Sequence, residues 1–185
     1  GPTPMPRRKD ALVGASAIVG EVNRIGHAHA PHACATVGHM QVRPNSRNVI
    51  PGQVFLTVDF RHPSDDTLSE MSSELETFCD ALATRAGLVV DVVDFWHFPP
   101  TPFDEACVNA VREGAEAGGF SHRDIISGAG HDAIYLAGVA PAGMVFIPCE
   151  DGISHNEIEN ATPEDCAAGC QVLLHAALER AGAVD

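Results

Sequence analysis

Residues 53–61 read Gln53-Val54-Phe55-Leu56-Thr57-Val58-Asp59-Phe60-Arg61, and this stretch decides the fold of the first half of the chain. Every second residue is apolar, and the apolar phase consists of Val54, Leu56, Val58 and Phe60. This period of two predicts a β-strand with one face packed on a core. Arg61 falls on the other phase, so we expect its side chain to point away from the face that packs on helices.

A second strand is predicted over residues 34–42, joined to the first by a polar connection that holds Pro44, Asn45, Pro51 and Gly52. Helical spacing runs through 7–25 and 68–85 and stops at Gly26 and Gly87, as helices often do. The β-branched run 88–93 predicts a third strand.

The predicted order is therefore α-β-β-α-β. One further strand before Gly1 would complete a β-α-β-β-α-β unit, a ferredoxin-like antiparallel sheet with both helices on one face. We expect the chain to begin just after that first strand.

A domain boundary is expected at Phe98-Pro99-Pro100-Thr101-Pro102, because prolines so close together exclude both helix and inner strand. It divides the chain into 1–98 and 99–185. Beyond it the patterns alternate, with helices over 103–117, 131–137 and 163–181 and strands over 124–126 and 143–147. Thr162 as N-cap and Pro163 at the first helical position begin the last helix. The predicted class is α/β: an α+β first part, then the βα portion of an α/β domain.

Two motifs in the second half carry site chemistry. Ser127-Gly128-Ala129-Gly130-His131-Asp132-Ala133 is a small-residue turn whose backbone N–H groups, with the dipole of the following helix, can stabilise negative charge. Gly152-Ile153-Ser154-His155-Asn156-Glu157 follows an apolar strand, and His155 can offer a neutral imidazole to a metal. Catalytic zinc usually takes about three protein ligands, so the others are elsewhere or missing.

Motifs spread over the whole chain carry a resemblance to a known family. They are Gly1-Pro2-Thr3-Pro4-Met5 with Arg8-Lys9-Asp10-Ala11-Leu12, Pro44-Asn45-Ser46-Arg47-Asn48-Val49-Ile50-Pro51-Gly52, Asp59-Phe60-Arg61-His62, Met144-Val145-Phe146-Ile147-Pro148-Cys149 and the two motifs above. The chain resembles the C-terminal part of the N-carbamoyl-L-amino-acid hydrolases. That group includes allantoate amidohydrolases and β-ureidopropionases, within the M20 metallopeptidase-like amidohydrolases. The family's N-terminal metal-binding segment has no counterpart here.

The resemblance implies a role for particular residues. His155 matches a metal ligand, and the expected ion is divalent, zinc first, with manganese, cobalt or nickel as alternatives. Asn48 and Arg61 match residues that hold the substrate's carbonyl and carboxylate, reaching the site on lid closure or from a partner subunit. In the turn, Ser127 and Ala129 are expected to bind substrate, and Gly128, Gly130 and His131 to assist catalysis. Residues 1–98 would form a lid and homodimerisation domain, and 99–185 the end of the catalytic domain.

Each of these residues also has a plainer interpretation. His155 could be a loop residue hydrogen-bonded to Asn156 or Glu157, although Glu157 and Glu159 could also orient its ring. Arg61 could form an ordinary ion pair with Asp59 or Asp65, and Asn48 could be a turn residue. The small-residue motif could be a tight turn capped by Asp132, with His131 fixing the turn or donating to substrate.

Composition narrows the partners and the compartment. The formal charge is −14, and no cluster of Lys or Arg is evident along the sequence, which disfavours nucleic acid and anionic membranes. No apolar run approaches the ~20 residues of a membrane span, and no signal peptide is evident, so a cytoplasmic protein is expected. The cysteines show no CxxC spacing and predict buried free thiols. His27, His29 and His32 are irregularly spaced around Pro31 and predict a solvated loop.

The activity expected of the full-length protein is metal-assisted hydrolysis of the C–N bond of N-carbamoyl-L-amino acids or related ureido acids. Two alternatives remain. The chain by itself could be a non-catalytic dimerisation and substrate-docking fragment, or the protein could be a dipeptide-cleaving metallopeptidase of the same superfamily. The sequence alone does not choose the substrate, because the pocket is only partly present.

Overall fold

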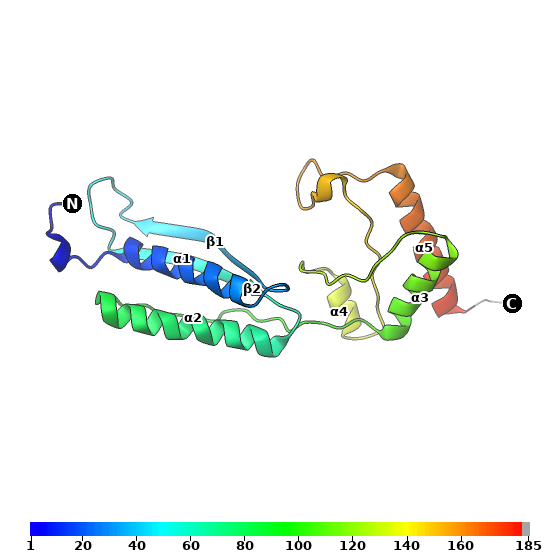
Figure 1. Cartoon of the computed structure of the whole chain (residues 1–185), viewed down its shortest axis with the longest axis horizontal. Coiled ribbons are helices and arrows are strands. Elements are labelled where there is room, and N and C mark those ends of the chain that lie inside the picture. Colours follow the sequence, from blue (N-terminus) through cyan, green and yellow to red (C-terminus); the bar gives the residue numbers. More distant parts are fainter. Residues whose placement is uncertain (183–185) are drawn as a thin grey trace. The chain divides into compact units, whose positions relative to one another are not determined.

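The computed structural model describes residues 1–182, and the chain divides into two compact units, Gly1–Pro100 and Thr101–Asp185 (Figure 1). Unit 1 contains η1 (Met5–Arg7), α1 (Ala11–Ala28), β1 (Cys34–Arg43), β2 (Gln53–Arg61) and α2 (Asp65–Ala86). Unit 2 contains α3 (Glu105–Ala117), α4 (Ala133–Ala137), η2 (Glu150–Gly152) and α5 (Pro163–Ala181). The predicted mixed α/β class is confirmed.

The sheet of unit 1 is an antiparallel ribbon of β1 and β2, as the hairpin prediction required. Cys34 lies opposite Arg61 at one end and Arg43 opposite Gln53 at the other, with an irregularity between Val37 and His39. The alternation along β2 is confirmed, because Phe60 packs on the core while Arg61 is exposed. One face of the ribbon is therefore structural and the other is available for contacts.

The core of unit 1 lies where α1 and α2 pack together and against that structural face (Figure 1). Ile25 of α1 and Met71 of α2 are fully buried, and the other buried members are Val22, Leu75 and Cys79. Gly26, expected to end the first helix, instead lies inside α1. A Cβ placed there would stand 2.8 Å from the Cβ of Ala35 in β1, so the glycine permits close helix–sheet packing. Gly87 does end α2 as predicted, with φ 62° and its N–H bonded to the Ala83 carbonyl.

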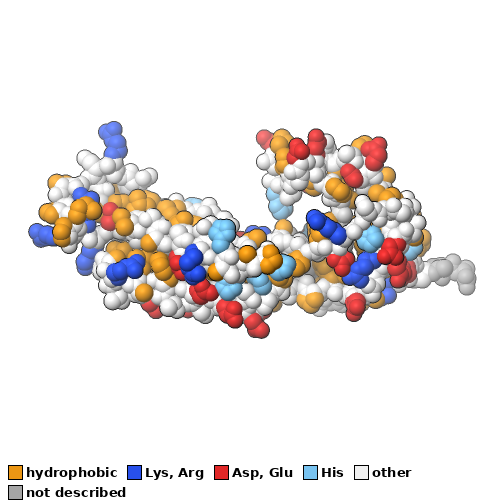
Figure 2. All heavy atoms as spheres, in the orientation of Figure 1, with side chains coloured by type: hydrophobic (Ala, Val, Ile, Leu, Met, Phe, Trp, Pro, Cys, Tyr) orange, Lys and Arg blue, Asp and Glu red, His pale blue; other side chains and the backbone are white. Residues whose placement is uncertain are grey.

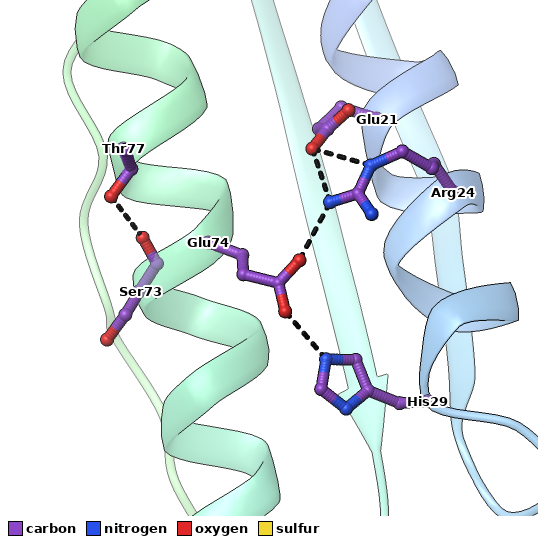
Figure 3. A network of polar contacts seen from close by, with 6 residues as sticks. All are labelled: Glu21, Arg24, His29, Ser73, Glu74 and Thr77. Carbon is purple, nitrogen blue, oxygen red and sulfur yellow. Dashed lines mark hydrogen bonds and ion pairs between the residues drawn. The ribbon is translucent and has the colours of Figure 1, made fainter.

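A polar network joins α1 to α2 at the edge of this core (Figure 3). Glu74 accepts a 2.7 Å bond from Arg24 Nη2 and lies 2.7 Å from His29 Nε2, while Arg24 also pairs with Glu21. The hydrogen bond with His29, followed by that from Arg24, lowers the pKa of Glu74. The prediction of a solvated loop is therefore wrong for His29, which sits beside the core with a largely covered side chain.

Three predicted strands, 88–93, 124–126 and 143–147, are not strands in the described part of the chain. A strand is defined by a ladder of hydrogen bonds to a neighbour, and no partner strand faces these segments among residues 1–182. Their apolar side chains are still used for packing. Val90 lies against the core of unit 1, and Ile147 lies so close to Gly169 of α5 that a Cβ there would clash.

Unit 2 is organised around the packing of α3 on α5. The contact is close because Gly114 of α3 faces the Val172 carbonyl of α5, which would stand 3.1 Å from an added Cβ. The predicted start of α5 is confirmed, since Thr162 accepts the Asp165 N–H and Pro163 opens the helix. The opposite side of α5 carries three leucines that are about 60% exposed: Leu173, Leu174 and Leu178.

The cysteines are free thiols, but burial was predicted correctly only for Cys79. Cys107 and Cys149 are half-buried, and Cys34, Cys166 and Cys170 are exposed. Within residues 1–182, no helix combines the length and the apolar character that crossing a membrane requires.

Candidate functional site

The turn 127–132 is exposed and leads into α4. The backbone N–H groups of Ala129, Gly130, His131 and Asp132 have no hydrogen-bond partner among residues 1–182. Asp132 does not cap the helix with its side chain, contrary to the plainer interpretation. Because α4 is only five residues long, its summed dipole is small, so any stabilisation of an anion here would rest on the N–H groups themselves.

His131 fixes the turn in place of Asp132. Its Nδ1 accepts the backbone N–H of Ala133 at 3.0 Å. A backbone N–H can only donate, so Nδ1 must carry the lone pair and the neutral ring must carry its hydrogen on Nε2. The two roles weighed for His131 are thus compatible, because fixing the turn through Nδ1 leaves Nε2–H as a donor.

Gly128 and Gly130 have no internal reason to be glycine. Neither adopts a positive φ, and a Cβ placed at either position would meet no atom within 4 Å. Glycine is required where the backbone needs unusual angles or where something approaches it closely. Since the described chain supplies neither condition, these positions leave room for a molecule that approaches the turn.

His155 lies on an exposed loop after η2 and has a left-handed φ of 55°. Glu159 Oε2 accepts its backbone N–H at 2.7 Å, so Glu159 holds the main chain and not the ring. The ring itself has no hydrogen-bond partner within the part of the chain that the structure describes. Non-glycine residues in this region are uncommon and cluster at functional sites.

The donor atoms around His155 do not complete a metal site. Within residues 1–182, no group of three His, Cys, Asp or Glu side chains is placed to hold a metal ion. An exposed imidazole fits the chemistry of one zinc ligand, and the remaining ligands would have to come from outside these residues.

Arg61 forms the ion pair with Asp59 that the plainer interpretation foresaw. Its Nη2 donates to Asp59 Oδ2 at 2.7 Å, and its Nε to the same oxygen at 3.1 Å. This hydrogen bonding raises the pKa of the guanidinium, which is cationic at any working pH. Both side chains are about half exposed, so Asp59 holds the fork in a solvent-accessible position.

Asn48 lies in the exposed connection between β1 and β2, and its Oδ1 accepts a 3.2 Å bond from Ser46 Oγ. In this connection the left-handed backbone occurs at Asn45, with φ 56°. Gly1 contacts the backbone of Asn48, and Ala11 N bonds to Pro51 O, so the N-terminal segment supports this connection.

Asn48 and Arg61 are at opposite ends of the ribbon (Figure 1). The connection follows Arg43 and precedes Gln53, whereas Arg61 ends β2 opposite Cys34. At ~3.3 Å per residue, the eight steps of β2 span roughly 26 Å. One small substrate cannot touch both residues of the same protomer.

Comparison with known proteins identifies the family of this chain. The model of peptidase family M20/M25/M40 matches residues 7–179. The chain is 42% identical over 185 residues to an N-carbamoyl-L-amino-acid amidohydrolase of Rhizobium meliloti, covering 100% of this chain and 44% of that protein. It is 33% identical over 174 residues to an allantoate amidohydrolase of Escherichia coli K12, covering 94% and 42%.

Solved structures that resemble this chain come from the same group of proteins. An amidase of the hydantoinase/carbamoylase family from Burkholderia multivorans matches with a TM-score of 0.92 at 62% identity, covering 98% of this chain and 44% of that one. A dinuclear metal-binding M20 peptidase from Bacillus subtilis shares the fold, with a TM-score of 0.66 at 17% identity over 92% of this chain and 46% of that one. The chain thus spans less than half the length of the relatives it matches.

Proposed function

This chain belongs to peptidase family M20/M25/M40, and on that basis we propose that it forms part of a metal-dependent amidohydrolase acting on N-carbamoyl-L-amino acids or related ureido acids. The observation that carries the proposal is the 42% identity to an N-carbamoyl-L-amino-acid amidohydrolase, sustained over all 185 residues. For an N-carbamoyl amino acid, attack of water on the carbamoyl carbon releases ammonia, and the carbamate that remains breaks down to the amino acid and carbon dioxide.

The residues of this chain have separate roles in the proposed reaction. Arg61 binds the substrate carboxylate with two parallel hydrogen bonds, in exchange for Asp59. The N–H groups of the turn, with Nε2–H of His131, stabilise the charge that develops on the carbonyl oxygen. His155 is one ligand of a divalent ion, zinc first among the candidates. When bound, such an ion polarises the carbonyl and acidifies a water molecule.

The distance between Asn48 and Arg61 favours a homodimeric enzyme. If both contact one substrate, they belong to different protomers, because the ribbon separates them by roughly 26 Å within one chain. A symmetric dimer would supply two such composite sites.

Because the metal site is incomplete within residues 1–182, we also propose that the 185-residue chain alone is a docking and dimerisation module without catalytic activity. The test compares this chain with the product of its complete open reading frame, both loaded with zinc. We expect ammonia release from N-carbamoyl amino acids, allantoate or β-ureidopropionate, together with bound zinc, in the longer protein only.

Each alternative has its own signature in that experiment. Cleavage of dipeptides without ammonia release from ureido acids would assign the protein to the dipeptidases. Stoichiometric zinc and turnover by the 185-residue chain would show that the proposed division of the site is wrong.

A further inference from the structure

Six of the chain's 11 Lys and Arg residues belong to segments that meet at one end of unit 1. The N-terminal segment, the β1–β2 connection and the end of α2 converge there. Gly1 contacts Asn48, Ala11 bonds to Pro51, and a Cβ at Gly87 would lie 3.4 Å from Lys9 Cε. The cations that these segments bring are Arg7, Arg8, Lys9, Arg43, Arg47 and Arg85. We name this region the basic end.

Carboxylates are nearly absent from the segments that form the basic end. Asp10 is the single acidic residue in 1–20, 41–52 and 81–90, and its carboxylate caps α1. Elsewhere in unit 1, Arg24 and Arg61 are each paired with carboxylates. Of the residues that the structure describes, none accepts a side-chain hydrogen bond or ion pair from Arg7, Lys9, Arg43, Arg47 or Arg85.

Figure 2 shows Lys and Arg side chains gathered around η1 and the neighbouring connection. The local excess of cationic side chains there contrasts with the formal charge of −14 for the whole chain. An anion is repelled by most of such a surface and attracted to this part of it. Arg7, Arg8 and Lys9 are consecutive in the sequence, but only the fold brings Arg43, Arg47 and Arg85 to the same end of unit 1.

Asn48 belongs to this region, next to Arg47 in the chain and in contact with Gly1. We propose that the basic end steers carboxylate-bearing substrates toward Asn48 by long-range attraction, with Arg43 and Arg47 as its main contributors. The inference rests on the proposed function. It adds charged residues that raise the rate of substrate capture without touching the reacting atoms.

A small anion suits this surface better than a nucleic acid. A polyanion needs a continuous basic track, but α2 leaves the basic end in the direction of Asp80, Glu76 and Glu74. The basic end can therefore attract a small anion. A long phosphate chain would extend past it and be repelled by these carboxylates.

The kinetic test uses the full-length protein with a zinc-loaded site. Arg47→Glu changes the charge of the basic end by two units, and Arg180→Glu in α5 is the control with the same change in net charge. A two-unit change about 10 Å from an anion in water corresponds to roughly a fourfold change in capture. We expect kcat/KM for an N-carbamoyl amino acid to fall about fourfold in Arg47→Glu at 10 mM salt. The difference should nearly vanish at 0.5 M salt, where the Debye length is only about 4 Å.

A second measurement needs no turnover. In Ser46→Cys of the 185-residue chain, the thiol next to Arg47 is titrated with an anionic aromatic disulfide and with a neutral one, against the parent chain as background. We expect the anionic reagent to react faster relative to the neutral one at low salt, and Arg47→Glu to abolish the preference.

Three outcomes separate the two proposals. Turnover by the parent enzyme with equal kcat/KM for Arg47→Glu and Arg180→Glu overturns steering and leaves the proposed function intact. Absence of ureido-acid turnover by the parent enzyme refutes the proposed function and substrate steering with it, whereas the thiol measurement still decides whether the positive field exists. Retention of the chain on duplex DNA at 0.15 M salt would assign the basic end to a polyanion instead.

Discussion

Arg61 forms an ion pair with Asp59 in this structure, whereas the proposed function assigns a substrate carboxylate to the same guanidinium. If Arg61 binds the substrate carboxylate in the full-length enzyme, Arg61→Ala loses charge and fork, and Arg61→Lys loses only the fork. Charge-assisted hydrogen bonds contribute ~1.5–3 kcal/mol each, so kcat/KM should fall roughly ten- to a hundredfold or more, with Ala worse than Lys and bound metal unchanged.

Asp59→Ala is the matched control for that series. It removes the same ion pair while keeping the guanidinium, so it should cost at most a few-fold in kcat/KM. Equal losses for Asp59→Ala and Arg61→Ala would show that the pair is structural and that Arg61 does not bind substrate.

At His155, substitution should affect the metal before it affects the substrate. In the full-length protein we expect His155→Ala to lower metal affinity more than roughly tenfold, with a parallel loss of activity, because an ion loses a direct ligand. His122→Ala serves as the control, since His122 is another imidazole of unit 2 that contacts the Phe120 carbonyl. Metal content that is unchanged in His155→Ala would exclude ligation by this residue.

At the scale of elements, the stability of the packing between α1 and α2 has a pH-dependent component. The folded-state pKa of Glu74 lies below its ordinary value of 4.5, because the His29 bond and then Arg24 favour the carboxylate. A carboxyl with a lowered folded-state pKa stabilises the fold above its unfolded-state pKa, and that stabilisation is lost as pH falls through the folded-state value.

We therefore expect Glu74→Gln to lower the free energy of unfolding of unit 1 at pH 7 by at most about 1 kcal/mol, since Glu74 is partly exposed. This difference in the free energy of unfolding between the parent protein and Glu74→Gln should persist down to pH 5 and shrink below about pH 4.5. Unfolding in urea is followed by the loss of helical circular dichroism, to which α1 and α2 contribute. Glu76→Gln, on the exposed side of the same helix, should show no such gap. A gap that widens in acid would contradict the assignment.

At the scale of the whole molecule, the separation of Asn48 from Arg61 makes a prediction about assembly. In the full-length enzyme, Asn48→Ala and Arg61→Ala should each impair both sites of a homodimer. A mixed dimer of the two variants should contain one intact site and one doubly altered site if each site draws Asn48 and Arg61 from different protomers. Random mixing should then restore about a quarter of the parent activity.

Mixed dimers are identified by native mass spectrometry, and the double variant mixed with the parent protein provides the comparison. Mixed dimers without recovered activity would place both residues in one protomer's site or remove one of them from it.

Local patterns predicted much of the fold because they describe local causes. The alternation in 53–61, the Thr162–Pro163 start and the Gly87 stop each concern one element and its immediate packing. Predictions that needed a neighbour failed. Residues 88–93, 124–126 and 143–147 have the composition of strands, but a strand needs a partner, and composition does not supply one.

For the candidate site, too, the sequence pointed to individual residues but not to the contacts between them. The sequence singled out His131 and His155, but not the bond from the Ala133 N–H that fixes the His131 ring or the carboxylate of Glu159 on the His155 main chain. It also missed the contact of His29 with Glu74, because these residues are 45 positions apart and no local pattern links them.

The glycines of this chain fall under two kinds of evolutionary constraint. Gly87 is held by the fold, since its φ of 62° is required wherever α2 must end. Gly128 and Gly130 have ordinary backbone angles and open space around them, so folding of the described residues exerts no selection on them. Relatives that keep the fold but lack the proposed activity should thus retain Gly87 and vary at 128 and 130. Substitutions at Gly128 and Gly130 would then identify the relatives in which the proposed activity has been lost.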